Sequence, residues 1–282
     1  MEPTPRSVFL NVDGVSCYAN SITQIILNVP QFCYEINRHE KPGPVTNQLQ
    51  QLLMDMSNKK SPLYTLPLRC TVGEQYAQIE QRDACEFLLD LLQRLTTENT
   101  SIYELVNGLE GQEEICINSP QCTHPVKIGF DPFQVFTIYL PVHTFQNKTL
   151  TSFKEMVQQW HLFDKLCPLC HCALRRRTIL RAAGHFLFLS LCLFHRQNQR
   201  VSARVTDFNP DDVELAGNHY KVIGAVCHVG ETTQSGHYWC TLRVNQKWLY
   251  ISDENICSKP QFIENLQNVY VMLLEKIAIS EE

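Results

Sequence analysis

The stretch Asn11–Gln24 constrains this chain more than any other, because it places a cysteine at the start of a helix. A turn at Asp13 and Gly14 leads into Ser16 and Cys17, and apolar residues at helical spacing follow. Ser16 is a residue type that often caps a helix N-terminus, so Cys17 is expected in the first turn. The unpaired N–H groups and the helix dipole there are expected to lower the thiol pKa below its ordinary value of about 8.5. A half-buried cysteine without a chemical role is the simpler alternative.

Composition limits the classes of protein that this chain can belong to. The hydrophobic fraction of 44% and the charged fraction of 19% are those of an ordinary globular protein, and the net charge of -5 disfavours nucleic acid as a partner. The longest apolar run, 186–194, is too short to span a bilayer, and the first residues contain no apolar signal segment. The 13 cysteines are therefore expected to be reduced thiols, metal ligands or a nucleophile. We expect a protein of the cytoplasm or nucleus that binds no membrane.

Helical patterns come first along the chain and strand patterns follow. Segments 45–56 and 80–95 carry apolar residues at helical spacing, and 150–160 favours a short helix. The later segments have the residue types of strands: 133–140, 186–194, 220–229, 237–244, 248–252 and 269–275. Asn245 and Gln246 can form a two-residue hairpin turn. This order predicts one α+β domain with an antiparallel sheet.

A thiol nucleophile needs a base within hydrogen-bond reach and a third group that fixes the tautomer of the imidazole. His237 follows Gly236 and begins a predicted strand. Ser252 and Asp253 stand at the end of the strand that the hairpin would pair with it, so either could reach His237. Composition alone does not select His237 from the ten histidines.

Four segments carry a resemblance to the ubiquitin-specific proteases. The cysteine box of that family is similar to NVDGVSCYANSITQ, and its QQDAxEF helix is similar to QRDACEFLLDLL. Its histidine box is similar to YKVIGAVCHVGETTQSGHYWCTLRVNQKWLYISDENI, and the later half of its zinc fingers is similar to CPLC at Cys167–Cys170. The resemblance covers Leu10–Leu274, and four motifs in the same order are far more specific than any one of them.

This resemblance implies a papain-like cysteine protease fold. Within a single domain, 1–282, it implies a helical thumb at about 7–110, β fingers at 111–182 and an antiparallel-sheet palm at 183–278. The implied activity is that of a deubiquitinating thiol isopeptidase, which hydrolyses the bond after the C-terminal glycine of ubiquitin without a catalytic cofactor. Its partners would be ubiquitin or ubiquitin conjugates, and it would act as a monomer or in a targeting complex.

The resemblance also implies roles for individual residues. Cys17 would be the nucleophile and His237 the general base. Two acidic residues would hold the arginine-bearing tail of ubiquitin, and two aromatic residues would line its narrow channel: Asp83, Glu86, His228 and Tyr238.

Two positions depart from the pattern of that family. Its oxyanion asparagine lies five residues before the cysteine, where this chain has Val12, so the adjacent Asn11 is the candidate donor. Losing one oxyanion donor would cost about 10²–10³ in rate. Ser252 stands where the family usually has Asp or Asn. We predict that Asp253 matters at least as much as Ser252, because a carboxylate stabilises an imidazolium better than a hydroxyl does.

The cysteines also predict a structural zinc site. Its expected ligands are Cys116, Cys122, Cys167 and Cys170. The second pair has the spacing of a zinc knuckle, whereas five residues separate the first pair, where the family has two. Spare ligands are His124, His171 and Cys172.

Two other functions remain open at this point. The chain could be a protease for another ubiquitin-like modifier, since Gly-Gly tails are shared. It could also be a catalytically weak ubiquitin-binding module, for which Val12 and Ser252 are the only grounds. The presence of Cys17, His237 and Asp253 together favours an active enzyme.

Overall fold

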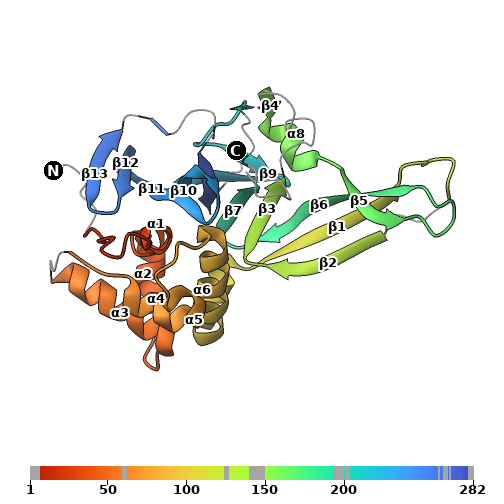
Figure 1. Cartoon of the computed structure of the whole chain (residues 1–282). Coiled ribbons are helices and arrows are strands. Elements are labelled where there is room, and N and C mark those ends of the chain that lie inside the picture. The colour runs from red at the N-terminus through yellow and green to blue at the C-terminus, as the bar shows by residue number, and fades with distance from the viewer. Residues whose placement is uncertain are drawn as a thin grey trace.

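The structure is a computed structural model that describes residues 7–58, 62–123, 127–139, 150–192, 200, 204–259, 261–262, 266 and 268–278. His124, one of the expected spare zinc ligands, lies outside these residues. A helical lobe, an eight-stranded sheet and a four-stranded sheet make up most of the fold. The four-stranded sheet extends away from the other two parts as a long arm (Figure 1).

The helical lobe is formed by the first part of the chain. Its helices are α1 (Cys17–Ile26), α2 (Pro30–Asn37), α3 (Pro44–Ser57), α4 (Leu66–Val72), α5 (Glu74–Ala77), α6 (Ala84–Glu98) and α7 (Thr100–Val106). Helices α2 and α3 begin on a proline, whose fixed φ suits the first helical position. Helix α6 begins at Ala84 and not at Glu80, because Asp83 caps it by accepting hydrogen bonds from the N–H groups of Cys85 and Glu86 (2.7 and 3.2 Å).

The eight-stranded sheet holds most of the later strands. They are β3 (Val135–Tyr139), β7 (Phe186–Cys192), β9 (Val213–Leu215), β10 (Asn218–Thr232), β11 (Ser235–Val244), β12 (Lys247–Ser252), β13 (Asn255–Lys259) and β14 (Val269–Lys276). The order is β13-β12-β11-β10-β14-β7-β3, with β9 on β10. The pairs are antiparallel except β3 with β7. Asn245 and Gln246 both have positive φ and form the predicted turn between β11 and β12.

The arm has the strand order β2-β1-β6-β5. Its strands are β1 (Gly108–Cys116), β2 (Lys127–Phe133), β5 (His161–Leu166) and β6 (Ala173–Ala183). Residues 150–160, which were expected to form a short helix, contain β4 (Leu150–Ser152) and then α8 (Phe153–Gln158). Strand β4 pairs with β8 (Arg204–Thr206). No helix in the described ranges is both long and apolar enough to cross a membrane.

Helix α1 lies at the centre of the molecule, and all of its residues are buried. Its apolar side chains, among them Ile22 and Ile25, belong to the main hydrophobic core, and Ile25 lies beside Gly224 of β10. One of its polar side chains, Asn20, ties the helix to the preceding loop by donating to the carbonyl of Leu10 (3.2 Å). The helix that carries Cys17 is therefore held between the other helices of the lobe and the eight-stranded sheet.

Candidate active site

Cys17 is the first residue of α1 and is only 1% exposed. The loop before it is held by Asp13, whose carboxylate accepts hydrogen bonds from the N–H groups of Val15 and Ser16 and from the Ser16 hydroxyl (2.6 Å). Arg69, which is fully buried, donates to Asp13 and Ser16 and to two backbone carbonyls in and after α5. The expected side-chain cap by Ser16 is therefore wrong: its hydroxyl is occupied by Asp13, and no capping bond forms.

Burial raises the pKa of the Cys17 thiol to about 11, which is opposite to the expected direction. The N–H groups of Tyr238 and Tyr18 act to lower this pKa, and the charge of Asp253 acts to raise it. Desolvation of the thiolate outweighs the helix terminus, because the thiol is enclosed. The side chain of Gln81 also reaches the thiol, with its Nε2 3.8 Å from Sγ. Burial of Cys17 therefore favours the neutral thiol over the thiolate.

His237 lies at the start of β11, next in the chain to Tyr238. Its Nε2 is 2.7 Å from the Ser252 hydroxyl oxygen, and the next residue, Tyr238, directs its N–H at Cys17. The indole of Trp239 lies nearly parallel to the imidazole, with the ring centroids 6.4 Å apart. Since Nε2 is bound by Ser252, the other ring nitrogen, Nδ1, is left to serve the thiol. The sheet therefore brings Cys17, His237 and Ser252 to one place.

Asp253 reaches the site through other residues. Its carboxylate accepts hydrogen bonds from Asn11 Nδ2 (3.2 Å) and Asn20 Nδ2 (2.8 Å), and no described contact joins it to His237. Asp253 has a φ of 49°, so the chain turns sharply after Ser252. Consecutive side chains at the end of β12 leave on opposite faces, and only Ser252 faces the imidazole. The expected direct contact between Asp253 and the imidazolium is corrected accordingly.

Asn11 points into the site, while Val12 points away from it. Val12 is 73% exposed, and the Asn11 Oδ1 accepts a hydrogen bond from the N–H of Ser16 (2.8 Å). With its Nδ2 on Asp253, the Asn11 amide is fixed at the N-terminus of α1. The turn that ends at Gly14, which has a φ of 73°, accommodates the shift of one residue.

The two acidic candidates differ in exposure. Asp83 is buried: one of its oxygens caps α6, and the other accepts from the hydroxyl of Tyr270 (2.7 Å). Glu86, in the first turn of α6, is exposed. Asp83 therefore positions the helix, and its expected contact with an arginine is corrected because both of its oxygens are already bound. Glu86 is the carboxylate that a ligand can reach.

The two aromatic candidates are closed off from solvent. His228 has no exposed surface; its Nδ1 is 3.1 Å from Arg200 Nη1 and its Nε2 is 3.2 Å from the Ser235 carbonyl oxygen. Tyr238 is also fully buried, and its hydroxyl donates to the carbonyl of Thr233 (2.8 Å). In this structure both side chains hold the turn between β10 and β11, so the expected open channel is not formed at these residues.

Sequence reasoning missed Gln81 and Arg200. Gln81 stands two residues before Asp83 and begins the segment QRDACEFLLDLL, so its position in that motif was the available signal. Arg200 lies in a segment without a pattern, and no signal marked it.

The four expected metal ligands come together at the end of the arm. Their Sγ atoms all lie within 4.8 Å of one another, with Cys116 and Cys170 at 3.4 Å and Cys122 and Cys167 at 3.7 Å. A tetrahedral zinc site with bonds of about 2.3 Å places its sulfurs about 3.8 Å apart, so these residues fit structural zinc. The N–H of Asn118 donates to Cys116 Sγ, and successive turns after β1 absorb the long spacing to Cys122.

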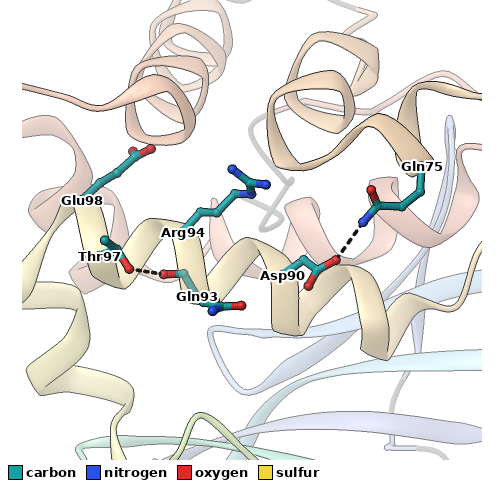
Figure 2. A pocket seen from close by; sticks show the side chains of 6 residues that line it. All are labelled: Gln75, Asp90, Gln93, Arg94, Thr97 and Glu98. Atoms are coloured by element: carbon teal, nitrogen blue, oxygen red, sulfur yellow. Dashed lines mark hydrogen bonds between the residues drawn. The ribbon is translucent and has the colours of Figure 1, made fainter.

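A polar hollow of about 440 Å³ on α6 is a different feature (Figure 2). Its lining residues are Gln75, Asp90, Gln93, Arg94, Thr97 and Glu98. Asp90 accepts from Gln75 and from the hydroxyl of Tyr76, and Glu98 accepts from the first N–H groups of α3. These bonds hold the helices of the lobe together, and the lining contains no cysteine or histidine.

The buried cysteine at a helix N-terminus, beside a strand that carries a histidine with a hydroxyl partner, defines a papain-like thiol hydrolase. The chain belongs to the ubiquitin carboxyl-terminal hydrolase family, whose model matches residues 10–273. Ubiquitin carboxyl-terminal hydrolase 23 of Arabidopsis thaliana is 23% identical to it over 215 residues, which make up 67% of this chain and 24% of that protein. The chain therefore spans about a quarter of the length of that relative.

The fold is also found in a solved relative. The SAGA DUB module of Ubp8, Sgf11, Sus1 and Sgf73 bound to monoubiquitin contains a chain that superimposes with a TM-score of 0.72. The match covers 99% of this chain and 71% of that chain at 17% identity. The α+β, papain-like fold expected from the sequence is thereby confirmed.

Proposed function

We propose that this protein is a deubiquitinating thiol isopeptidase that hydrolyses the bond after the C-terminal glycine of ubiquitin. The observation that carries the proposal is the hydrogen bond between His237 Nε2 and Ser252, formed on the strand that passes the Cys17 thiol. A cysteine with a bound and oriented imidazole beside it is the arrangement that nucleophilic acyl transfer requires. Membership of the family supports the choice of ubiquitin as substrate.

The reaction follows from these groups. His237 takes the thiol proton, and the Cys17 thiolate attacks the carbonyl carbon of the terminal glycine of ubiquitin. The N–H of Cys17 and the Nδ2 of Asn11 stabilise the negative charge on the carbonyl oxygen. The imidazolium gives its proton to the lysine amine, which leaves as the thioester forms. Water, deprotonated by His237, then cleaves the thioester, so that the ubiquitin carboxylate leaves and the thiol is restored.

The raised pKa of Cys17 assigns a further task to His237. A thiol with a pKa of about 11 is protonated at neutral pH, so the thiolate forms only as a pair with the imidazolium. Because Ser252 binds Nε2, Nδ1 is the ring nitrogen left to accept the thiol proton. Glu86, exposed on α6, is the carboxylate that holds an arginine of the ubiquitin tail.

The test uses ubiquitin that carries a C-terminal electrophile. The wild-type protein is expected to form a covalent one-to-one adduct, seen by mass spectrometry, and Cys17→Ala is expected to form none. Cys70→Ala removes an exposed cysteine and is the matched control, which should react like the wild type.

Each other outcome of this labelling test would identify a different function. Binding of ubiquitin by the wild type without an adduct would identify a binding module in place of an enzyme. Absence of both, together with an adduct to a probe built on another Gly-Gly modifier, would identify a protease for that modifier.

A further inference from the structure

An aromatic groove of about 300 Å³ lies on the face of the eight-stranded sheet that points away from α1. Trp239 and Thr241 of β11 and Trp248 and Tyr250 of β12 line it, with Lys259, Gln261 and Asn268 at its edge. The alternate residues of the same strands, Cys240 and Ile251, face α1. The groove and the helix of the nucleophile therefore lie on opposite faces of one sheet.

The groove begins at the catalytic histidine. Trp239, its first residue, lies nearly parallel to the imidazole of His237, and the ring of Tyr250 is 5.7 Å from that of Trp239. Tyr250 is two residues before Ser252, so it shares a face with the hydroxyl that binds His237. A bound peptide that leaves the active site along the Trp239 side of His237 would meet this groove next.

Two side chains of the groove carry polar atoms that the fold does not satisfy. Trp239 is 7% exposed and Thr241 is 4% exposed, and neither Trp239 Nε1 nor Thr241 Oγ1 has a hydrogen-bond partner in the described part of the chain. Buried groups of this kind are rare in native proteins, because each one costs stability. Both atoms are enclosed, so the surface that the groove offers to an occupant is the apolar surface of its aromatic side chains.

We propose that this groove binds the acceptor side of the conjugate, namely the aliphatic stem of the linked lysine and an apolar residue beside it. The inference rests on the proposed function. His237 must protonate the departing lysine amine, while the ubiquitin tail approaches from α6, where Glu86 is exposed. The lysine and its flanking residues therefore leave on the other side of the imidazole, towards Trp239.

The chemistry of the groove suits this occupant. Flat aromatic rings are a good surface for methylene groups and apolar side chains. Lys259 is the charged residue at its edge, so an acidic residue in the acceptor segment is favoured over a basic one.

The test compares three substrates. One is ubiquitin with a C-terminal aminocoumarin, and the others are ubiquitin linked through an isopeptide bond to a peptide with leucine and aspartate beside the lysine, or to one with glycine and serine there. Two variants alter the groove: Thr241→Leu fills it, and Lys259→Glu reverses the charge at its edge. Lys247→Ala, an exposed lysine at the turn of the same hairpin, is the matched control.

For the wild type and Lys247→Ala, kcat/KM for the leucine-aspartate conjugate is expected to exceed that for the glycine-serine conjugate by about tenfold. Thr241→Leu is expected to remove this preference. Lys259→Glu is expected to lower it and to favour a conjugate with leucine and lysine instead. Dividing each value by kcat/KM for the aminocoumarin substrate corrects for damage to the catalytic residues, and circular dichroism confirms folding.

Equal preferences in the wild type and both variants, with the aminocoumarin substrate still cleaved, would overturn the inference and leave the proposed function standing. The same result with loss of self-association in the variants would assign the groove to a second copy of the chain. Failure of the wild type to cleave any of the substrates would overturn the proposed function, and the inference with it.

Discussion

Ser252 and Asp253 are neighbours in the chain, but their side chains act on different parts of the site. Ser252 bonds His237, whereas Asp253 bonds Asn11 and Asn20 at the start of α1. We therefore interpret Ser252 as the group that fixes the imidazole tautomer. We interpret Asp253 as a positioning residue, which holds the Asn11 amide at the N-terminus of α1.

This division predicts a particular pattern of kinetic losses. Asn11→Ala and Asp253→Ala are each expected to lower kcat for ubiquitin aminocoumarin by about 10²-fold, because both remove the same oriented donor. The double variant is expected to lose little more than either single one. Additive losses would show that Asp253 acts independently of Asn11.

Two further variants complete this comparison. Glu254→Ala changes the exposed carboxylate next to Asp253 and is the control. Ser252→Ala is expected to lose no more activity than Asp253→Ala, and a clearly larger loss would contradict the ranking predicted from the sequence.

At the residue scale, sequence patterns located the site but did not fix the direction of each side chain. The order of motifs identified Cys17 and His237 as candidates, and the structure places Cys17 at the start of α1 and His237 near the start of β11. The order of motifs could not show that Asn11 turns inward or that His228 is enclosed, because both depend on turns and on contacts with residues distant in the sequence. The thiol pKa was expected in the wrong direction because burial is not visible in a local pattern.

At the scale of elements, the turn between β10 and β11 is held by a buried cluster. Arg200 donates to the carbonyls of His228 and Gly230 and to Asn268, and it also reaches the His228 ring. His228 in turn bonds the carbonyl of Ser235, at the start of β11. This cluster fixes the strand that carries His237.

The cluster predicts that acid destabilises the protein. Burial, together with the charge of Arg200, lowers the pKa of His228 from 6.5 to about 4, so the unfolded state binds more protons between these values. The stability is present above pH 6.5 and is lost as the pH falls towards 4, by about 2 kcal/mol between pH 7 and pH 5.

Urea unfolding at pH 7 and pH 5 measures this effect. His228→Gln should lose less stability than the wild type over this interval, because the glutamine does not titrate. His39→Gln, at a half-buried histidine of the helical lobe, is the control and should behave like the wild type. Equal losses in all three proteins would exclude His228 as the cause.

Elements with a clear apolar pattern were predicted well, whereas short helices and the polar strands β1 and β6 of the arm were not delimited. The strands β7, β10, β11, β12 and β14 and the helices α1, α3 and α6 lie where the patterns placed them, within a few residues. Helices α2, α4, α5 and α7 were missed, because four to eight residues contain too few turns to show a period. Proline and the caps at their N-termini, such as Asn99 of α7, were the available signals.

At the scale of the whole molecule, the arm depends on its cysteine cluster. Cys116 ends β1 and Cys122 follows it, whereas Cys167 and Cys170 lie between β5 and β6, so the metal would join the end of β1 to the turn between β5 and β6. Sequence spacing indicated the ligands, but a convergence across some 45 residues could be established only by the fold.

Purified protein is therefore expected to contain one zinc ion per chain by elemental analysis. Cys122→Ser should lower the zinc content and the thermal midpoint, because the free energy of binding a structural metal contributes to folding. Cys70→Ser, at an exposed cysteine of α4, should retain both. Less than half an equivalent of zinc in the wild type would contradict the assignment.

The enclosure of Cys17 also bears on how the protein would withstand oxidants. Peroxide attacks the thiolate form of cysteine, and an inaccessible thiol with a pKa of about 11 presents almost none of it at neutral pH. The resting nucleophile is thereby shielded from sulfenic acid formation, while exposed cysteines such as Cys70 and Cys257 meet the oxidant first. Cys17 would become vulnerable only once the ion pair with His237 has formed.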